Sequence, residues 1–293
     1  MKRDFLTGEE LGAFELDKLL NRAAELKAGR RDGVGAGDLA RRGIGLVFEK
    51  PSTRTRISFE VGVAELGATP IVLRGDELQL SRGESIGDTG RVLSRYLDAI
   101  VIRSGSHENV AELAAEAEVP VVNALTPLHH PCQALADLLT MRERFGGLDG
   151  LRLAYVGDGN NVARSLAIAC ELAGVELVVA APDGYQLEEG HGARLTADPR
   201  AAADSADAIY TDVWVSMGDE DEAKRRREAL APYQVNDELL SAASDRAIVL
   251  HCLPAHPGEE ITEEVLYGDR SAVWDQAENR LHSQKALLEL LLS

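Results

Sequence analysis

The 293-residue sequence has few cysteines and no long hydrophobic run, and each shortage excludes a class of protein. Cys132, Cys170 and Cys252 are too few and too irregularly spaced for a disulfide framework or a zinc pattern. No run of about 18 apolar residues occurs, so we expect no transmembrane helix. The opening segment MKRDFLTGEE lacks the apolar stretch of a signal peptide. The sequence therefore predicts a cytoplasmic protein.

Positive charge is also scarce. Lysine and arginine together number 31 against 49 acidic residues, which gives a formal net charge of −18 and a pI of about 4.8. Such a surface repels nucleic acid and anionic membranes, so neither is an expected partner. Only 6 of the basic residues are lysine and 25 are arginine. Excess carboxylate with scarce lysine suits a halophilic protein, but an ordinary acidic enzyme fits the composition equally well.

Strand-like and helical patterns alternate almost throughout the chain. Hydrophobic residues make up 45% of it, enough for two cores, and the length favours two domains. The alternation predicts an α/β fold with two doubly wound domains, each with a central parallel sheet flanked by helices. We expect strands at 43–48, 70–73, 99–103, 120–124, 151–157, 175–182, 208–212 and 247–252, and helices at 10–28, from 52, and at 86–97, 108–117, 131–145, 160–174 and 276–293. The first domain would comprise residues 1–138, completed by the helix 276–293, and the second residues 139–275.

The segment FEKPSTRTRISFE, residues 48–60, opens a helix with an unusual first turn. Ser52 is a natural N-cap, but the turn after it holds Arg54 and Arg56 where the helix dipole favours carboxylates. A bound phosphate would reverse this penalty, because free N–H groups, hydroxyls and guanidinium groups would converge on one dianion. The alternative is that both arginines point into solvent. We therefore predict a phosphate site at this helix.

The same segment resembles the carbamoyl phosphate signature of the aspartate and ornithine carbamoyltransferases. Three further stretches are similar to the ornithine branch: HPCQ at 130–133, DVWVSMG at 212–218 and HCLP at 251–254. Order and spacing agree from about residue 40 to AENR at 277–280. The resemblance implies transfer of a carbamoyl group from carbamoyl phosphate to the δ-amine of ornithine, giving citrulline, in a homotrimer or a multiple of trimers. It implies no metal and no organic cofactor.

The resemblance also implies a set of site residues. Catalytic roles fall to Arg103, His130, Asp212 and Cys252. Carbamoyl phosphate would be held by Ser52, Thr53, Arg54, Thr55, Gln79, Arg103, His130, Gln133, Cys252, Leu253 and Arg280. Ornithine would be held by Asn161, Asp212, Ser216 and Met217, with Asn160 as a structural neighbour. His251 could bind a metal, but no ligand at a useful spacing in the sequence accompanies it.

Other functions remain open at the sequence level. YVGDGNNVAR partly matches the dinucleotide fingerprint, with Val162 in place of the third glycine and Asp183 where a ribose acid could lie. An aspartate or N-acylornithine carbamoyltransferase and a non-catalytic homologue are nearer alternatives. Asp212 favours an acceptor that carries an ammonium group. Pro257, where the branch would have a basic residue, and the acidic SMGDEDE stretch depart from the expected pattern.

Overall fold

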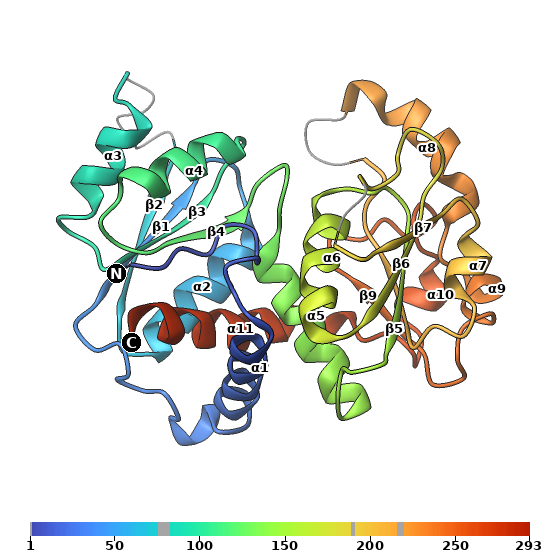
Figure 1. Cartoon of the computed structure of the whole chain (residues 1–293), viewed down its shortest axis with the longest axis horizontal. Helices are drawn as coiled ribbons and strands as arrows, with labels where there is room; N and C mark the ends of the chain where they lie inside the picture. Colours follow the sequence, from blue (N-terminus) through green and yellow to red (C-terminus); the bar gives the residue numbers. More distant parts are fainter. Residues whose placement is uncertain (1, 76–82, 189–190, 216–219) are drawn as a thin grey trace. The chain divides into compact units, whose positions relative to one another are not determined.

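The computed structural model describes residues 2–75, 83–188, 191–215 and 220–293. The chain forms two compact units (Figure 1). Unit 1 contains residues 1–139 and 278–293, and unit 2 contains residues 140–277. The chain passes from one unit to the other within helix α5 (Pro131–Phe145) and returns within helix α11 (Val273–Leu292).

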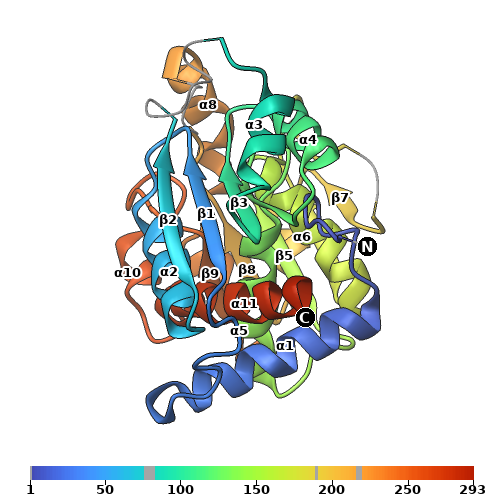
Figure 2. The same ribbon diagram turned by 90° about the vertical axis from the view of Figure 1, so that its left-hand side faces the viewer.

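Unit 1 is built on a four-stranded parallel sheet of order β2-β1-β3-β4. Its strands are β1 (Gly43–Phe48), β2 (Thr69–Arg74), β3 (Ala99–Arg103) and β4 (Val121–Leu125). Its other helices are α1 (Ala13–Ala28), α2 (Thr53–Glu65), α3 (Ile86–Leu93) and α4 (His107–Glu116), with a 3-10 turn at Arg30–Asp32. Helices α3 and α4 cover one face of the sheet, and α1, α2 and α11 lie on the other (Figures 1 and 2).

The core of unit 1 explains why its central strands are almost wholly apolar. Strands β1 and β3 are covered on both faces, so their residues are buried in succession rather than in alternation. Gly45 of β1 lies so close to Leu97 that an added Cβ would be 2.5 Å from its side chain. A larger residue at position 45 would therefore displace Leu97 from the cluster that α3 and α4 form against the sheet.

Unit 2 is built on a five-stranded parallel sheet of order β7-β6-β5-β8-β9. Its strands are β5 (Arg152–Val156), β6 (Glu176–Ala180), β7 (Arg194–Thr196), β8 (Ala208–Thr211) and β9 (Ile248–His251). Its helices are α6 (Asn161–Ala173), α7 (Pro199–Ala203), α8 (Ala223–Leu230), α9 (Asp237–Leu240) and α10 (Glu263–Leu266), with 3-10 turns at Glu220–Glu222 and Ala231–Tyr233. Side chains from α7, α9 and α10 form one core cluster with the sheet, and α6 lies on the opposite face (Figure 1).

The predicted fold class is confirmed: both units carry a parallel sheet with helices on its two faces. Several details differ. The third helix ends at Leu93 instead of continuing to residue 97, and β7 and α7 were not predicted. In α2, whose apolar residues include Ile57, Phe59 and Val63, the last two are buried but Ile57 is 54% exposed. The helix therefore turns a narrower apolar stripe to the core than its sequence suggests.

No helix among the described residues combines the length and apolar character needed to span a lipid bilayer.

Candidate active site

Both sheets reverse their strand order at one point, and the predicted site residues follow the strands that flank it. In unit 1 this point lies between β1 and β3, and in unit 2 between β5 and β8. Open α/β sheets bind ligands outside the carboxyl ends of strands at such a point. The connection to α2 follows β1, and Arg103 ends β3 in register with Phe48 of β1. Asp212 directly follows β8.

Ser52 occupies the N-cap position of α2, as predicted, but its side chain makes no capping hydrogen bond. Its hydroxyl instead accepts a hydrogen bond of 2.8 Å from Nη1 of Arg103. The expectation that the Ser52 side chain caps the helix is therefore wrong, because its hydroxyl bonds Arg103 and no N–H group of α2. The first N–H groups of the helix and the Arg103 guanidinium consequently lie at one place, and both are donors.

The two arginines of the unusual first turn have different surroundings. Arg56 donates to Glu60 one turn later at 2.9 Å, which is an ordinary exposed i,i+4 ion pair. Arg54 is also exposed, and no acidic residue lies in the first turn of α2. The Glu60 carboxylate therefore accounts for the position of Arg56.

Arg280 supplies a buried cation to the same helix. Its guanidinium donates from Nη2 to Thr55 Oγ1 and from Nη1 to Gln133 Oε1, both at 2.9 Å. Gln133 in turn donates to Asp137 at 2.8 Å. All four side chains are buried. The predicted residues Thr55, Gln133 and Arg280 are thus brought together, and Asp137 is a partner that sequence reasoning missed.

His130 is buried at the start of α5. Burial lowers the pKa of its imidazole well below the ordinary value, and the nearby cations Arg280, Arg103 and Arg54 lower it further. The ring is therefore neutral at pH 7 and carries one N–H that can donate to an oxygen atom. This placement agrees with a role for His130 near an anion.

The neutral state of His130 predicts a difference in acid stability. In the unfolded chain a histidine takes up a proton below pH about 6.5, whereas folded His130 does not. Its contribution to stability is therefore complete above pH about 6.5 and is lost by about 1.4 kcal/mol per pH unit below it. The His130→Gln variant should lose less stability than wild type between pH 7.5 and about 5. Urea unfolding followed by circular dichroism measures this, and parallel profiles would contradict it.

Glu49 is a further residue that the sequence did not single out. Its carboxylate accepts hydrogen bonds from Ser104 Oγ at 2.7 Å and from the Gly105 N–H at 2.9 Å, and its own N–H donates to the Arg103 carbonyl. These bonds join the carboxyl ends of β1 and β3 at the residues that follow Arg103. The only sequence signal was an acidic residue at the end of a buried strand.

In unit 2, Asp212 is the centre of a hydrogen-bonded chain. Cys252 donates from Sγ to Asp212 Oδ1 at 2.8 Å, and Asn160 donates from Nδ2 to Oδ2 at 2.7 Å. Tyr155 Oη donates to Asn160 Oδ1 at 3.1 Å. Asn160 also caps α6 by accepting from the N–H groups of Val162 and Ala163. It was expected to be only a neighbour, and its amide fixes the carboxylate that we expected to bind an amine.

His251 lies under the turn that carries Cys252 and Leu253. Its Nδ1 accepts from the Leu253 N–H at 2.8 Å, so its proton is on Nε2, which lies 3.2 Å from Glu260 Oε1. The structure also brings ligand atoms of Asp212, His251 and Cys252 within 4.8 Å of one another. Sequence spacing offered no metal-ligand partner for His251, but the fold places Asp212 and Cys252 near it. Both of its ring nitrogens nevertheless already have partners.

The other predicted residues can be placed only in part. Thr53 is exposed in the first turn of α2, and Asn161 is the first residue of α6, half-buried beside Asn160. Gln79, Ser216 and Met217 lie outside the residues that the structure describes.

The glycine loop after β5 is packed in a way that disfavours a dinucleotide. A Cβ on Gly159 would lie 2.3 Å from the backbone N of Leu187, and the Gly159 N–H donates to the Tyr185 carbonyl at 2.7 Å. In a dinucleotide site the second glycine lets the pyrophosphate approach the backbone. Here the segment at 185–187 takes that space, so the glycine serves close backbone packing.

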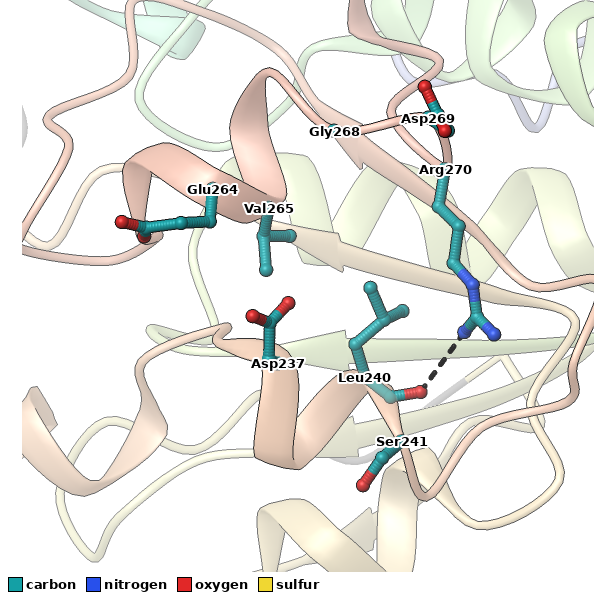
Figure 3. A pocket seen from close by; sticks show the side chains of 8 residues that line it. All are labelled: Asp237, Leu240, Ser241, Glu264, Val265, Gly268, Asp269 and Arg270. Atoms are coloured by element: carbon teal, nitrogen blue, oxygen red, sulfur yellow. Dashed lines mark hydrogen bonds between the residues drawn. The ribbon is translucent and has the colours of Figure 1, made fainter.

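A separate surface pocket of about 250 Å³ lies between α9 and α10 of unit 2 (Figure 3). Asp237, Leu240, Glu264 and Arg270 are among its lining residues, and Arg270 donates to the Leu240 carbonyl at 3.3 Å. The pocket contains none of the predicted site residues. We therefore place no part of the candidate active site there.

Comparison with known proteins agrees with this geometry. Residues 3–143 match the family model "Aspartate/ornithine carbamoyltransferase, carbamoyl-P binding domain", and residues 149–291 match its "Asp/Orn binding domain". An ornithine carbamoyltransferase of Acidothermus cellulolyticus is 56% identical, covering 100% of this chain and 97% of its own. Among solved structures, the ornithine carbamoyltransferase of Pyrococcus furiosus has a TM-score of 0.95 at 46% identity, covering 99% of this chain and 97% of its own. That of Thermus thermophilus has a TM-score of 0.92 at 44% identity over 100% of both chains. The chain therefore belongs to the aspartate/ornithine carbamoyltransferase family.

Proposed function

We propose that this protein transfers the carbamoyl group of carbamoyl phosphate to the δ-amine of L-ornithine, giving L-citrulline and phosphate. The observation that carries the proposal is the gathering of Arg103 and Arg280 at the start of α2, whose first turn holds Arg54 and no carboxylate. The relatives named ornithine carbamoyltransferase support ornithine as the acceptor.

Unit 1 is the carbamoyl phosphate-binding domain in this proposal. The phosphate lies against the first turn of α2, where it accepts from backbone N–H groups and from the side chains of Ser52, Thr53, Arg54 and Thr55. Arg103 and Arg280 add charge-assisted hydrogen bonds, which are stronger than neutral ones. The dianion also removes the unfavourable interaction between the helix dipole and the cations of its first turn. Gln133 contacts the carbamoyl group, and the resemblance supports contacts of Gln79, Cys252 and Leu253 with the same substrate.

The chemical step is the attack of an amine on the carbamoyl carbon, which places negative charge on the carbonyl oxygen. Arg103, His130 and Thr55 are the donors that we assign to this oxyanion. One such donor is typically worth about 2.7–4 kcal/mol in the transition state. A neutral His130 suits this role, because it donates an N–H without adding a fourth full positive charge to those of Arg54, Arg103 and Arg280. The phosphate leaves already paired with cations and needs little general-acid assistance.

Unit 2 is the ornithine-binding domain. Asp212 binds and orients the amine, and Cys252 and Asn160 hold the carboxylate of Asp212 in place. Asn161 binds the α-carboxylate of ornithine, and Ser216 and Met217 add polar contacts. An alkylammonium group has a pKa near 10.4, so the amine must lose a proton before it attacks. Desolvation beside the cations of the phosphate site lowers that pKa and favours the free amine.

We further propose that the protein assembles as a homotrimer or a multiple of trimers. The support is the family membership together with the resemblance of the segment around Gln79 to a loop that, in this family, a neighbouring subunit contributes.

An acceptor assay tests the proposed reaction. Purified protein is incubated with carbamoyl phosphate and with ornithine, aspartate or N-acetylornithine, at low and at molar salt. We expect a carbamoylated product only with ornithine, because the Asp212 carboxylate repels the dicarboxylate aspartate and the DVWVSMG stretch resembles the ornithine branch, not relatives that use acylated ornithine. Product from aspartate or N-acetylornithine instead would overturn the choice of acceptor. Folded protein that carbamoylates none of the three would support a non-catalytic homologue.

A further inference from the structure

The turn after the HCLP segment is closed by a backbone hydrogen bond. The Glu259 N–H donates to the His256 carbonyl at 2.9 Å, with Pro257 and Gly258 between them and Gly258 at a φ of +93°. Pro at the second position and Gly with positive φ at the third are the preferences of a type II β-turn. Pro257, which departed from the expected pattern, therefore fits the turn. The turn leaves His256 Nδ1 and Glu260 Oε2 3.8 Å apart.

Glu260 is a buried carboxylate, and one of its two oxygens accepts no hydrogen bond from the described residues. The residue is fully buried, and its Oε1 accepts from the His256 N–H and faces His251 Nε2. Its Oε2 has no hydrogen-bond partner among the described residues. A buried carboxylate oxygen without a donor is costly, and a bound cation would remove the cost.

The metal-ligand atoms around this oxygen have the spacing that a small divalent ion requires. Glu259 contributes a third ligand atom, and the atoms of His256, Glu259 and Glu260 all lie within 4.8 Å of one another. Tetrahedral ligands at the usual 2.0–2.2 Å from zinc lie about 3.4 Å apart. The 3.8 Å between His256 Nδ1 and Glu260 Oε2 is close to this spacing and too long for a hydrogen bond. The His256 side chain is 52% exposed, so an ion can enter from solvent.

We propose that His256, Glu259 and Glu260 bind one divalent transition-metal ion of the Zn²⁺, Co²⁺ or Ni²⁺ class. Imidazole with carboxylate ligands suits these ions, and water would complete the coordination. Arg227 Nε now lies 3.0 Å from Glu259 Oε1 on the exposed side. The ion would share the Glu259 carboxylate with Arg227 or displace Arg227 from it, because an exposed ion pair contributes little to stability.

The site would be connected to the HCLP turn. Glu260 would use Oε2 for the ion and keep Oε1 for His251, and His251 holds the Leu253 N–H through Nδ1. Hydrogen-bonded partners of metal ligands commonly fix one another's orientation. The inference goes beyond the proposed reaction, since metal binding can be measured whether or not carbamoyl transfer occurs.

Titration with Co²⁺ tests the site, because its visible absorption reports ligand type. The wild-type protein should bind one Co²⁺ per chain without the intense near-ultraviolet band of a thiolate ligand. The His256→Asn variant should bind at least about 10- to 100-fold more weakly. His191→Asn is the matched control: His191 is also a surface histidine beside a glutamate, with Nδ1 3.4 Å from Glu171 Oε2, but the Glu171 side chain is 57% exposed whereas that of Glu260 is buried. Its affinity should equal that of wild type.

A second cluster, formed by Asp212, His251 and Cys252, must be distinguished in the same experiment. The Cys252→Ser variant should retain Co²⁺ binding if the ion occupies the site at His256. A thiolate band that disappears in Cys252→Ser would overturn the proposal, and so would equal affinity of wild type and His256→Asn. Zn²⁺ should also raise the Tm of the wild-type protein and not that of His256→Asn. This second measurement shows that the variant is folded and reports the same site.

Discussion

The Arg54→Met variant is expected to bind carbamoyl phosphate about 100- to 1,000-fold more weakly than the wild-type protein, a loss of about 3–4 kcal/mol. Methionine keeps much of the length of the side chain but removes the cation from the first turn of α2. Without the ligand the same change should leave stability equal or raise it by about 0.3–1 kcal/mol, because an exposed cation at a helix N-terminus is unfavourable. Isothermal titration calorimetry and thermal unfolding measure the two effects.

Arg56→Met is the control for this experiment, since it removes the same charge two residues later. Arg56 is paired with Glu60 at 2.9 Å on the exposed side of the helix. An exposed pair is worth about 0.2–1 kcal/mol, so carbamoyl phosphate affinity should change by less than about fivefold. Equal losses in the two variants would mean that net charge, and not the Arg54 contact, accounts for binding. Unchanged affinity in Arg54→Met would refute its assigned role.

The Asp212→Asn variant is expected to lower kcat/KM for ornithine by about 100- to 1,000-fold, because it removes the carboxylate that pairs with the amine. An asparagine at this position would also face the donors Asn160 Nδ2 and Cys252 Sγ, which now both point at carboxylate oxygens. Its own NH₂ group can accept from neither of them. Carbamoyl phosphate affinity should fall far less, by no more than about tenfold, because the residues that we assign to its phosphate group lie in unit 1 and only Cys252, the hydrogen-bond partner of Asp212, joins the two effects.

Asp183→Asn is the matched control for Asp212→Asn. Asp183 is an exposed carboxylate of the same unit, at the position where a dinucleotide-binding protein would hold a ribose. An exposed change of this kind is usually worth within about 0.5 kcal/mol, so the steady-state constants for ornithine should hardly move. A loss as large in Asp183→Asn as in Asp212→Asn would contradict the assignment of the amine to Asp212.

The fold could be predicted because its strands leave a strong signal. Strands β1, β3, β5, β6, β8 and β9 are continuous apolar runs separated by helical patterns, as expected for parallel strands covered on both faces. The elements that were missed are short and weak. Strand β7 has three residues, none fully buried, and α7 is a five-residue helix begun by Asp198 and Pro199. Such segments depend on tertiary packing more than on their own pattern.

Sequence motifs indicated individual candidate site residues. They did not indicate which of these residues would be hydrogen-bonded to one another. Nothing in the sequence pairs Arg280 with Thr55, which lies 225 positions earlier, because only the folded chain brings them together. Asn160 and Asp137 could have been found. The first precedes a helix and is a strong N-cap type, and the second stands four residues after Gln133 on the same helix. Glu260 gave no local signal, since its burial is set by contacts with His251 and the turn at 256–259.

The last helix has a consequence for synthesis of the protein. Within unit 1, α11 is tied to earlier segments by Arg22 to Glu289 at 2.7 Å and by the buried Lys285 to Glu65 at 2.9 Å. It also supplies the Arg280 that bonds Thr55. A nascent chain on the ribosome can therefore form the sheet and α2 long before it holds this cation. The phosphate site becomes complete only after residue 280 has been added, so chains that stop before it should bind the donor substrate poorly even where their sheet has folded.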